Sequence, residues 1–214
     1  NKARVNIKWV QTEKIKNEKS VKNLFSNING VLILPGFGAR GSEGKIRIAK
    51  FSRENKIPFL GICLGLQCAV IEFARNVCNM EGADSTEFNK RTKFPVIDLM
   101  ESQRAIKIKG GTMRLGAYDC EIKTGTKTYA AYRKKRITER HRHRYEVNNR
   151  YRKKLEKNGL IFSGVNKDLG VVEAIEIKGH PWYIAGQFHP ELKSRVNKAH
   201  PLFREFIKAA LKTL

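Results

Sequence analysis

The chain has 214 residues, of which 41% are hydrophobic, 29% charged and 9% aromatic. This length and composition predict one globular domain that needs no disulfide or metal to fold, and no run approaches the roughly 18 to 20 apolar residues that span a membrane. Lys and Arg total 43 against 20 Asp and Glu, and the resulting net charge of +23 favours anionic partners such as nucleotides, nucleic acid or an acidic domain. The densest basic runs, at 133–136 and 150–154, lack interleaved aromatic residues, so we interpret them as solvated surfaces and not as a nucleic-acid groove.

The start of the chain and its cysteines bear on its cellular context. The chain opens without Met and without a signal-peptide pattern, so we expect it to be a piece of a longer polypeptide. No pair of cysteines has Cys-x-x-Cys spacing or a nearby His pair, which argues against a zinc site and a disulfide framework and favours a reducing cytoplasm. The four cysteines are Cys63, Cys68, Cys78 and Cys120.

In the first half of the chain, short apolar runs bounded by Gly or Pro alternate with stretches of helical period. Parallel strands joined by crossover helices have this pattern. The expected strands are 5–10, 30–36 and 57–63, and the expected helices are 46–53 and 64–77.

The second half reads differently, because its strand-like segments have only short connections. We expect strands at 112–123, 159–166, 170–179 and 181–189, which would extend the sheet in antiparallel or mixed fashion, and a helix over 200–214 that closes the core. The expected fold class is therefore α/β, with a mixed, mainly parallel central sheet flanked by helices.

The segment GICLGLQ, residues 61–67, has the pattern of a nucleophile elbow. Gly61 and Gly65 would be needed because side chains there would collide with neighbouring chain at a sharp strand-to-helix turn. The helix that follows would direct its free N–H groups at Cys63 and lower the pKa of the thiol. The alternative is that Cys63 is a buried structural cysteine beside two packing glycines.

A thiol nucleophile needs a base, and His189 has the best position for it. It ends an apolar strand, and Glu191 lies two residues further on, where an extended chain points its side chain the same way and can orient the imidazole. The alternative is a hydrogen-bonded structural histidine at a strand end. The other four histidines have weaker claims: His141 and His143 lie among arginines, and His180 and His200 precede prolines.

The loop LPGFGARG, residues 34–41, follows a predicted strand and carries three glycines. Its free main-chain N–H groups are suited to an oxyanion hole. Glycine-rich loops also bind phosphate, but the Gly-Lys-Ser/Thr ending of a P-loop is absent, so the phosphate interpretation is weak.

Six motifs together resemble the glutamine amidotransferase domains of the CTP synthase family, which are class I (triad) glutaminases with a flavodoxin-like fold. The resemblance implies that Cys63 forms a glutamyl thioester, that His189 is its base and acid, and that Glu191 orients His189. The motifs are LPGFGARGSEGK, PFLGICLGLQ, ADSTEF, GGTMRLGA, ERHRHRYEVNNR and GQFHPELKSR, and they run from about residue 30 to 204.

The same resemblance implies the binding residues. Glu87 would meet the substrate ammonium and Arg144 its carboxylate, while the alternatives are a helix-capping role for Glu87 and a solvated charge for Arg144. The backbone oxyanion donors would be Gly36 and Leu64. The glutamine-binding residues implied are Gly36, Leu64, Gly65, Leu66, Gln67, Glu87, Arg144 and Tyr145.

Three departures from the family pattern stand out. The oxyanion loop has a single glycine before Phe37 where the family usually has two, and the family's domain begins with one more strand and helix than this chain. The stretch between FPVIDLM and GGTMRLGA, which in the family is a lid linked to activation by GTP, is short. Arg114 follows this stretch and could pair with a phosphate of GTP; the alternative is a solvated strand residue.

The resemblance also implies partners. No cofactor or metal is expected in this domain, whereas a synthetase domain upstream would bind UTP, ATP and magnesium, so this chain alone would not make CTP. GTP would be an allosteric activator, and the full-length protein would be a homo-oligomer, expected to be a tetramer. Two rival functions remain: a class I amidotransferase domain serving another synthetase, such as GMP or anthranilate synthesis, and an inactive basic domain that binds nucleotides.

Overall fold

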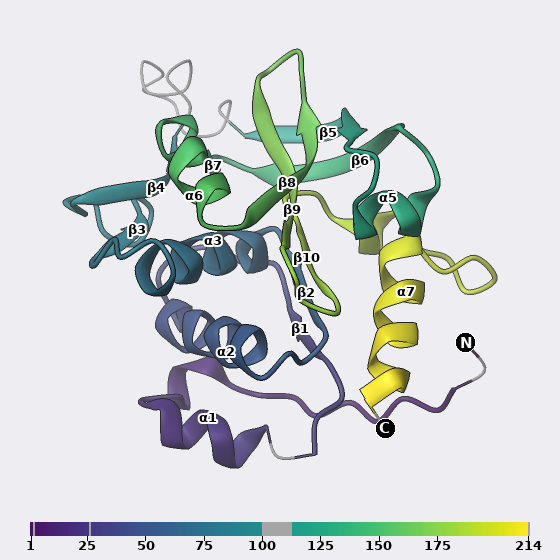
Figure 1. The fold of residues 1–214 in the computed structure, drawn as a ribbon, viewed down its shortest axis with the longest axis horizontal. Coiled ribbons are helices and arrows are strands. Elements are labelled where there is room, and N and C mark those ends of the chain that lie inside the picture. Colours follow the sequence, from purple (N-terminus) through teal and green to yellow (C-terminus); the bar gives the residue numbers. More distant parts are fainter. Residues whose placement is uncertain (2, 26, 100–112, 214) are drawn as a thin grey trace.

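A mixed sheet runs through the centre of the molecule (Figure 1). The computed structural model describes residues 1, 3–25, 27–99 and 113–213. Within them the main sheet has seven strands in the order β1-β2-β10-β9-β8-β5-β6. The strands are β1 (Val31–Ile33), β2 (Phe59–Ile62), β5 (Arg114–Ile122), β6 (Arg136–His143), β8 (Leu160–Asn166), β9 (Val171–Ile177) and β10 (Tyr183–Gly186).

Strand direction divides this sheet into two parts. β2 lies between β1 and β10 and is parallel to both, whereas each later pairing, from β10–β9 to β5–β6, is antiparallel. The α/β class and the mixed sheet are confirmed, as is the antiparallel extension in the second half. The parallel part is the part that carries the nucleophile elbow.

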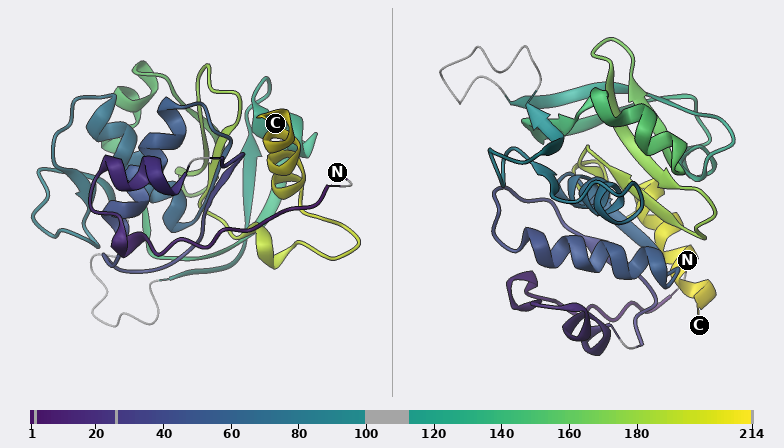
Figure 2. Two further views of the ribbon diagram at one scale, coloured as in Figure 1. Left: turned by 90° about the horizontal axis from the view of Figure 1, so that it is seen from below. Right: turned by 60° about the vertical axis from the view of Figure 1, so that its left-hand side comes forward.

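Helices cover both faces of the sheet (Figures 1 and 2). On one face α3 (Leu64–Asn76) packs on the strands, α2 (Ser42–Glu54) on α3, and α1 (Glu18–Leu24) on α2, while α5 (Lys127–Tyr132) and α7 (Pro201–Ala210) lie on the other face. β2 contributes side chains to the core on both faces of the sheet. Phe59 belongs to the core cluster that includes α3, and Leu60 belongs to the cluster that includes α7. The short helix α6 (Arg152–Lys157) packs on β8.

A second, three-stranded sheet lies beside α3. It has the order β3 (Ala83–Ser85), β4 (Phe94–Leu99) and β7 (Tyr145–Val147), with β4 parallel to β3 and antiparallel to β7. β6 ends at His143 and β7 begins at Tyr145, so the chain crosses from the large sheet to the small one at Arg144. This crossing brings the ends of both sheets to the same place.

Several elements differ from the sequence predictions. The helices at 64–77 and 200–214 are confirmed as α3 and as α7 followed by a short 3₁₀ turn, and α2 begins earlier than predicted, at Ser42. The strand predicted at 5–10 is wrong, because this segment pairs with no strand among the described residues and leaves Ile7 70% and Trp9 78% exposed. The prediction also missed α1, β3, β4, α5, β6, β7 and α6.

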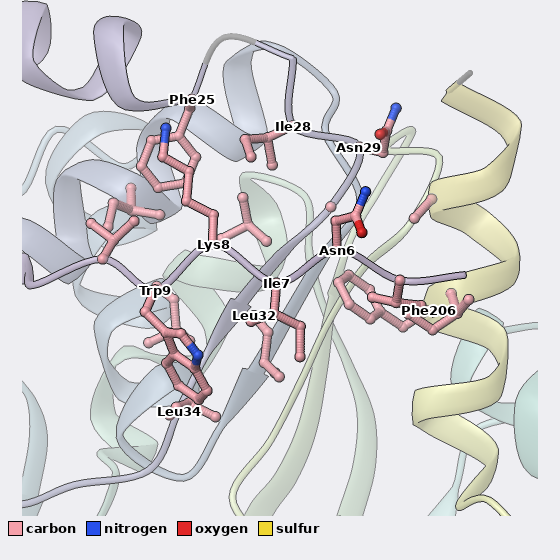
Figure 3. A pocket seen from close by; sticks show the side chains of 18 of the residues that line it. Asn6, Ile7, Lys8, Trp9, Phe25, Ile28, Asn29, Leu32, Leu34 and Phe206 are labelled. Atoms are coloured by element: carbon pink, nitrogen blue, oxygen red, sulfur yellow. The ribbon is translucent and has the colours of Figure 1, made fainter. Parts of the chain in front are cut away.

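The exposed N-terminal segment borders an apolar groove (Figure 3). The groove has a volume of about 810 Å³ and lies between residues 3–10 and the open edge of β1. Ile7, Trp9 and, from β1, Leu32 line it, and Phe206 of α7 lies at one end. β1 is an edge strand of the described sheet, so this groove contains an unpaired strand edge.

Two further findings concern the class of protein. Within the described residues, no helix is long and apolar enough to cross a membrane. All four cysteines are free and buried, and no cluster of three or more His, Cys, Asp or Glu in the described part of the chain could hold a metal ion.

Candidate active site

Cys63 stands at the sharp turn between β2 and α3, as the elbow pattern predicted. Its backbone has φ 53° and ψ −100°, a conformation that a residue with a side chain rarely adopts. A Cβ on Gly65 would lie 2.6 Å from the Ile33 carbonyl oxygen, and one on Gly61 would lie 2.8 Å from the Gly65 backbone. The prediction that both glycines are required by close packing is therefore confirmed.

The protonation state of Cys63 differs from the expectation. Burial raises the pKa of the thiol to about 12, and the charges of Glu146, Glu191 and Glu87 act in the same direction. The Leu64 backbone N–H does hydrogen-bond the sulfur and lowers the pKa, but burial outweighs it because Cys63 is only 2% exposed. The prediction of a lowered pKa is wrong for this conformation, in which Cys63 is a neutral thiol.

His189 and Glu191 form a pair at the end of β10. The Nδ1 atom of His189 lies 2.5 Å from Oε1 of Glu191, and the His189 backbone N–H donates to the Arg140 carbonyl at 2.8 Å. Burial is the largest single effect on Glu191 and opposes its ionisation, but the hydrogen bond from His189, a backbone hydrogen bond and the charges of His189 and His200 together lower the pKa of Glu191. Nε2 of His189 is buried without a hydrogen-bond partner within the described residues, so the nitrogen that a base would use is unengaged.

The same strand end supports Cys63. The Cys63 backbone N–H donates to the Gly186 carbonyl of β10 at 2.8 Å, and β2 and β10 are parallel neighbours. Parallel strands end at one edge of a sheet, so the elbow after β2 and the histidine after β10 emerge together. The cysteine, histidine and glutamate predicted from sequence are thus brought to one place.

The loop after β1 lies against the start of α3. A Cβ on Gly36 would be 3.1 Å from the Leu64 side chain, which places the two predicted oxyanion donors next to each other. Phe37, where the family pattern departs, is 55% exposed, and the Arg142 guanidinium lies 6.0 Å from its ring centre. Gly38 has φ +74° and donates its backbone N–H to Oε1 of Glu87 at 2.8 Å.

Glu87 lies in a turn after β3 and caps no helix, so the capping alternative is wrong. Burial raises the pKa of its carboxyl, although the hydrogen bond from Gly38 and the charge of Arg144 act in the opposite direction. Glu87 and Arg144 are therefore close enough to interact, and both are half-buried.

Arg144 and Tyr145 face the same region from the crossing between the sheets. Nε of Arg144 is buried and has no hydrogen-bond partner in the part of the chain that the structure describes. Nε2 of Gln67 donates to the Tyr145 carbonyl at 3.1 Å, so Gln67 supports this segment from α3. Gly65 and Leu66 are buried in the first turn of α3, where Leu66 is a core residue, 0% exposed.

Arg114 has surroundings different from those expected. It is 4% exposed and forms ion pairs with Glu146 at 2.8 Å and Glu173 at 2.7 Å, so the solvated alternative is wrong. Its contacts give no support to a role in binding a phosphate of GTP, which stays a prediction. The stretch predicted to be a lid, residues 101–109, lies outside the described residues.

The partners of Arg114 were not predicted from the sequence. Glu146 and Glu173 were not singled out, and His143 was set aside because arginines flank it. β6 has a strict alternation of exposed and buried residues, in which Glu139, His141 and His143 face inward. This two-residue alternation in the sequence of β6 was the feature that could have indicated that His143 is buried.

Comparisons with known proteins identify the family of the chain. The family model "Glutamine amidotransferase class-I" matches residues 1–209. The CTP synthase of Chloroherpeton thalassium is 55% identical over 213 residues, which cover 99% of this chain and 38% of that protein. The chain thus spans little more than a third of the length of such curated relatives.

Two solved structures resemble the fold. The glutaminase domain of Trypanosoma brucei CTPS with bound acivicin superposes with a TM-score of 0.92 at 36% identity, over 98% of this chain and 82% of that one. A protein from Thermoplasma acidophilum, assigned to a GMP synthase, has a TM-score of 0.59 at 17% identity, over 89% of this chain and 77% of that one, and shares the fold alone.

Proposed function

The chain belongs to the class I glutamine amidotransferases and, within them, to the glutaminase domains of CTP synthases, and from this premise we propose that Cys63, His189 and Glu191 hydrolyse glutamine to glutamate and ammonia. The observation that carries the proposal is the convergence of the strained elbow cysteine with the His189–Glu191 pair at one edge of the sheet. A cysteine nucleophile, a base and an orienting carboxylate are the groups that acyl transfer requires.

In the first step, the sulfur of Cys63 attacks the side-chain amide carbon of glutamine. Because the thiol is neutral in this conformation, its proton passes to Nε2 of His189 as the C–S bond forms. Glu191 accepts a hydrogen bond from Nδ1 and stabilises the imidazolium. The backbone N–H groups of Gly36 and Leu64 are the proposed donors to the oxyanion.

The second step reverses the proton movement. His189 gives its proton to the amine nitrogen, the C–N bond breaks, and ammonia leaves a glutamyl thioester on Cys63. His189 then takes a proton from water as the water oxygen bonds to the thioester carbon. The C–S bond breaks, His189 returns the proton to the sulfur of Cys63, and glutamate leaves.

Substrate recognition follows from charge complementarity. Glutamine presents an ammonium and a carboxylate, and Glu87 and Arg144 offer the opposite charges on neighbouring segments. The unpaired Nε of Arg144 is a buried donor among the described residues, and a substrate carboxylate would satisfy it. Tyr145 lies near Glu87 and would border the same ligand.

We place the remaining activity outside this chain. A synthetase domain upstream would use ATP and magnesium to aminate UTP with the ammonia, GTP would stimulate glutamine hydrolysis, and the whole protein would be an oligomer. A cytoplasmic location suits the four free thiols, because Cys63 must stay reduced to react.

The groove beside β1 supports the proposal that more of the domain precedes Asn1. The open edge of β1 and the exposed apolar residues Ile7 and Trp9 line the same groove. Its volume of about 810 Å³ is sufficient for a short extended segment. We assign to it a strand from the polypeptide upstream, which would pair with β1.

Replacing Cys63 in the longer polypeptide tests this function. Cys63→Ser should abolish CTP formation from glutamine and leave CTP formation from free ammonia intact, because the synthetase site does not use the thiol. Loss of both activities would make Cys63 structural, and amination of a different nucleotide would assign the domain to another synthetase.

A further inference from the structure

Five charged or titratable side chains form a buried cluster next to the candidate active site. Arg114 donates through Nη1 to Glu146 Oε1 at 2.8 Å and through Nη2 to Glu173 Oε1 at 2.7 Å. Nε2 of His141 lies 3.3 Å from Glu173 Oε2. All of them are at most 4% exposed: Arg114, His141, His143, Glu146 and Glu173.

The cluster closes the turn that carries Arg144 and Tyr145. His143 is the last residue of β6, and Glu146 follows three residues later in β7. Nε2 of His143 and Oε1 of Glu146 are 2.8 Å apart, so the two residues that flank the turn are joined through their side chains. The same oxygen of Glu146 accepts the hydrogen bond from Arg114.

Arg114 connects this turn to the main sheet. It lies on β5 opposite His143 of β6, and its second carboxylate partner, Glu173, lies on β9. The backbone carbonyl of Glu173 in turn accepts a hydrogen bond from the Gln187 N–H at 2.8 Å, two residues before His189. One guanidinium therefore links the turn at Arg144, between the two sheets, to the strands that present the base.

Charge balance makes Arg114 the critical member. Burial raises the pKa of Glu173 to about 7, the charge of Glu146 adds to this rise, and Arg114 opposes it. Without Arg114, two carboxylates would share a site from which water is largely excluded, and one would have to take up a proton or move away. Either change would disturb the contact between Glu146 and His143.

We propose that Arg114 is a positioning residue for glutamine binding, which acts through Glu146 and His143 to hold Arg144 and Tyr145 where they meet the substrate. This inference rests on the proposed glutaminase function. Arg114 touches neither the substrate nor Cys63 in this scheme, so its loss should weaken glutamine binding much more than it alters the chemistry of the thiol.

The test uses Arg114→Met in the longer polypeptide, with Arg53→Met as the matched control. Arg53 forms another Arg–Glu pair, with the buried Glu72 at 2.7 Å, although Arg53 itself is partly exposed, and Glu72 lies about 12 Å along α3 from its first turn. Two quantities are measured: the KM for glutamine, and the rate of Cys63 alkylation by iodoacetamide, which carries neither an ammonium nor a carboxylate.

Arg114→Met should raise the KM for glutamine about tenfold or more. The reason is that a displaced Arg144 would lose its charge-assisted hydrogen bond to the substrate carboxylate, and such a loss weakens binding by that order. The rate of Cys63 alkylation in Arg114→Met should stay within about twofold of the rate in the unsubstituted protein. Arg53→Met should leave the KM for glutamine within about twofold of the unsubstituted value. An unchanged KM in Arg114→Met, or an equal loss in hydrolysis and alkylation, would overturn the inference.

A second variant keeps the inference testable if Arg114→Met does not fold. Arg114→Lys keeps the charge but cannot donate to both carboxylates in the same plane, so it should raise KM several-fold, and an unchanged KM again overturns the inference. Protection of Cys63 from iodoacetamide by glutamine separates the proposed glutaminase function from the proposed positioning role of Arg114. If the unmodified protein shows neither hydrolysis nor protection, the function itself fails and the inference falls with it.

Discussion

The backbone N–H of Gly38 donates to Oε1 of Glu87 at 2.8 Å, which joins the loop after β1 to the turn after β3. Glu87 therefore has two proposed tasks: it holds the loop that carries Gly36, and it meets the ammonium of glutamine. The carboxylate has a second oxygen, so both tasks are compatible.

Two substitutions at Glu87 should separate these tasks. Glu87→Gln keeps an oxygen for Gly38 but loses the charge, so the KM for glutamine should rise about 10- to 100-fold with a smaller change in kcat. Glu87→Ala also releases the loop and should lower kcat as well. Steady-state glutaminase kinetics measure both, and a KM unchanged in Glu87→Gln would remove Glu87 from the binding site.

The buried, neutral thiol of Cys63 predicts a pH profile. Its pKa is raised to about 12, so in protein without glutamine the thiolate fraction, and with it the rate of iodoacetamide alkylation, should rise about tenfold per pH unit between about pH 7 and 10. Peptide mapping assigns the reaction to Cys63. A rate that levels off near neutral pH would mean that the thiolate is already formed.

His189 and Glu191 should differ in importance. His189→Ala removes the proposed base and should lower kcat by about 10² to 10⁴-fold, whereas Glu191→Gln leaves an oxygen that can still accept from Nδ1 and should cost less. Circular dichroism of both variants checks folding. Equal losses in two well-folded variants would count against these roles.

The groove beside β1 predicts a change at Trp9. In a version of the chain extended upstream, a strand in the groove should cover Trp9, which is 78% exposed here, and shift its fluorescence to shorter wavelength. Trp182 is only 7% exposed, so Trp182→Phe isolates the Trp9 signal in both versions. Identical Trp9 emission in the short and extended chains would mean that no segment occupies the groove.

The elbow and the triad were predictable because the features that define them are local. Gly61, Cys63 and Gly65 encode a turn in seven residues, and the spacing of His189 and Glu191 places both side chains on one side of the chain. The strand at 5–10 was predicted wrongly because apolar alternation does not say whether a neighbouring strand is present to pair with it.

The cluster around Arg114 could not be predicted for a different reason. Its members come from β5, β6, β7 and β9, and only the fold brings them together. The pKa of Cys63 was misjudged in the same way: the helix N-terminus is visible in the sequence, whereas the depth of burial that outweighs it is not. In charge-rich segments such as β6, the exposed arginines alternate with buried residues, and the high charge suggested that the whole segment was solvated.

Labelling with a glutamine-derived diazoketone, followed by peptide mass mapping, tests the central claim most directly, because the reagent reacts only where a bound glutamine analogue meets a nucleophile. The account predicts that Cys63 carries the label in the longer polypeptide, that excess glutamine protects it, and that Cys68, Cys78 and Cys120, which are buried and do not stand at the elbow turn, stay unlabelled. Label on any of those three cysteines, or none on Cys63, would contradict the account.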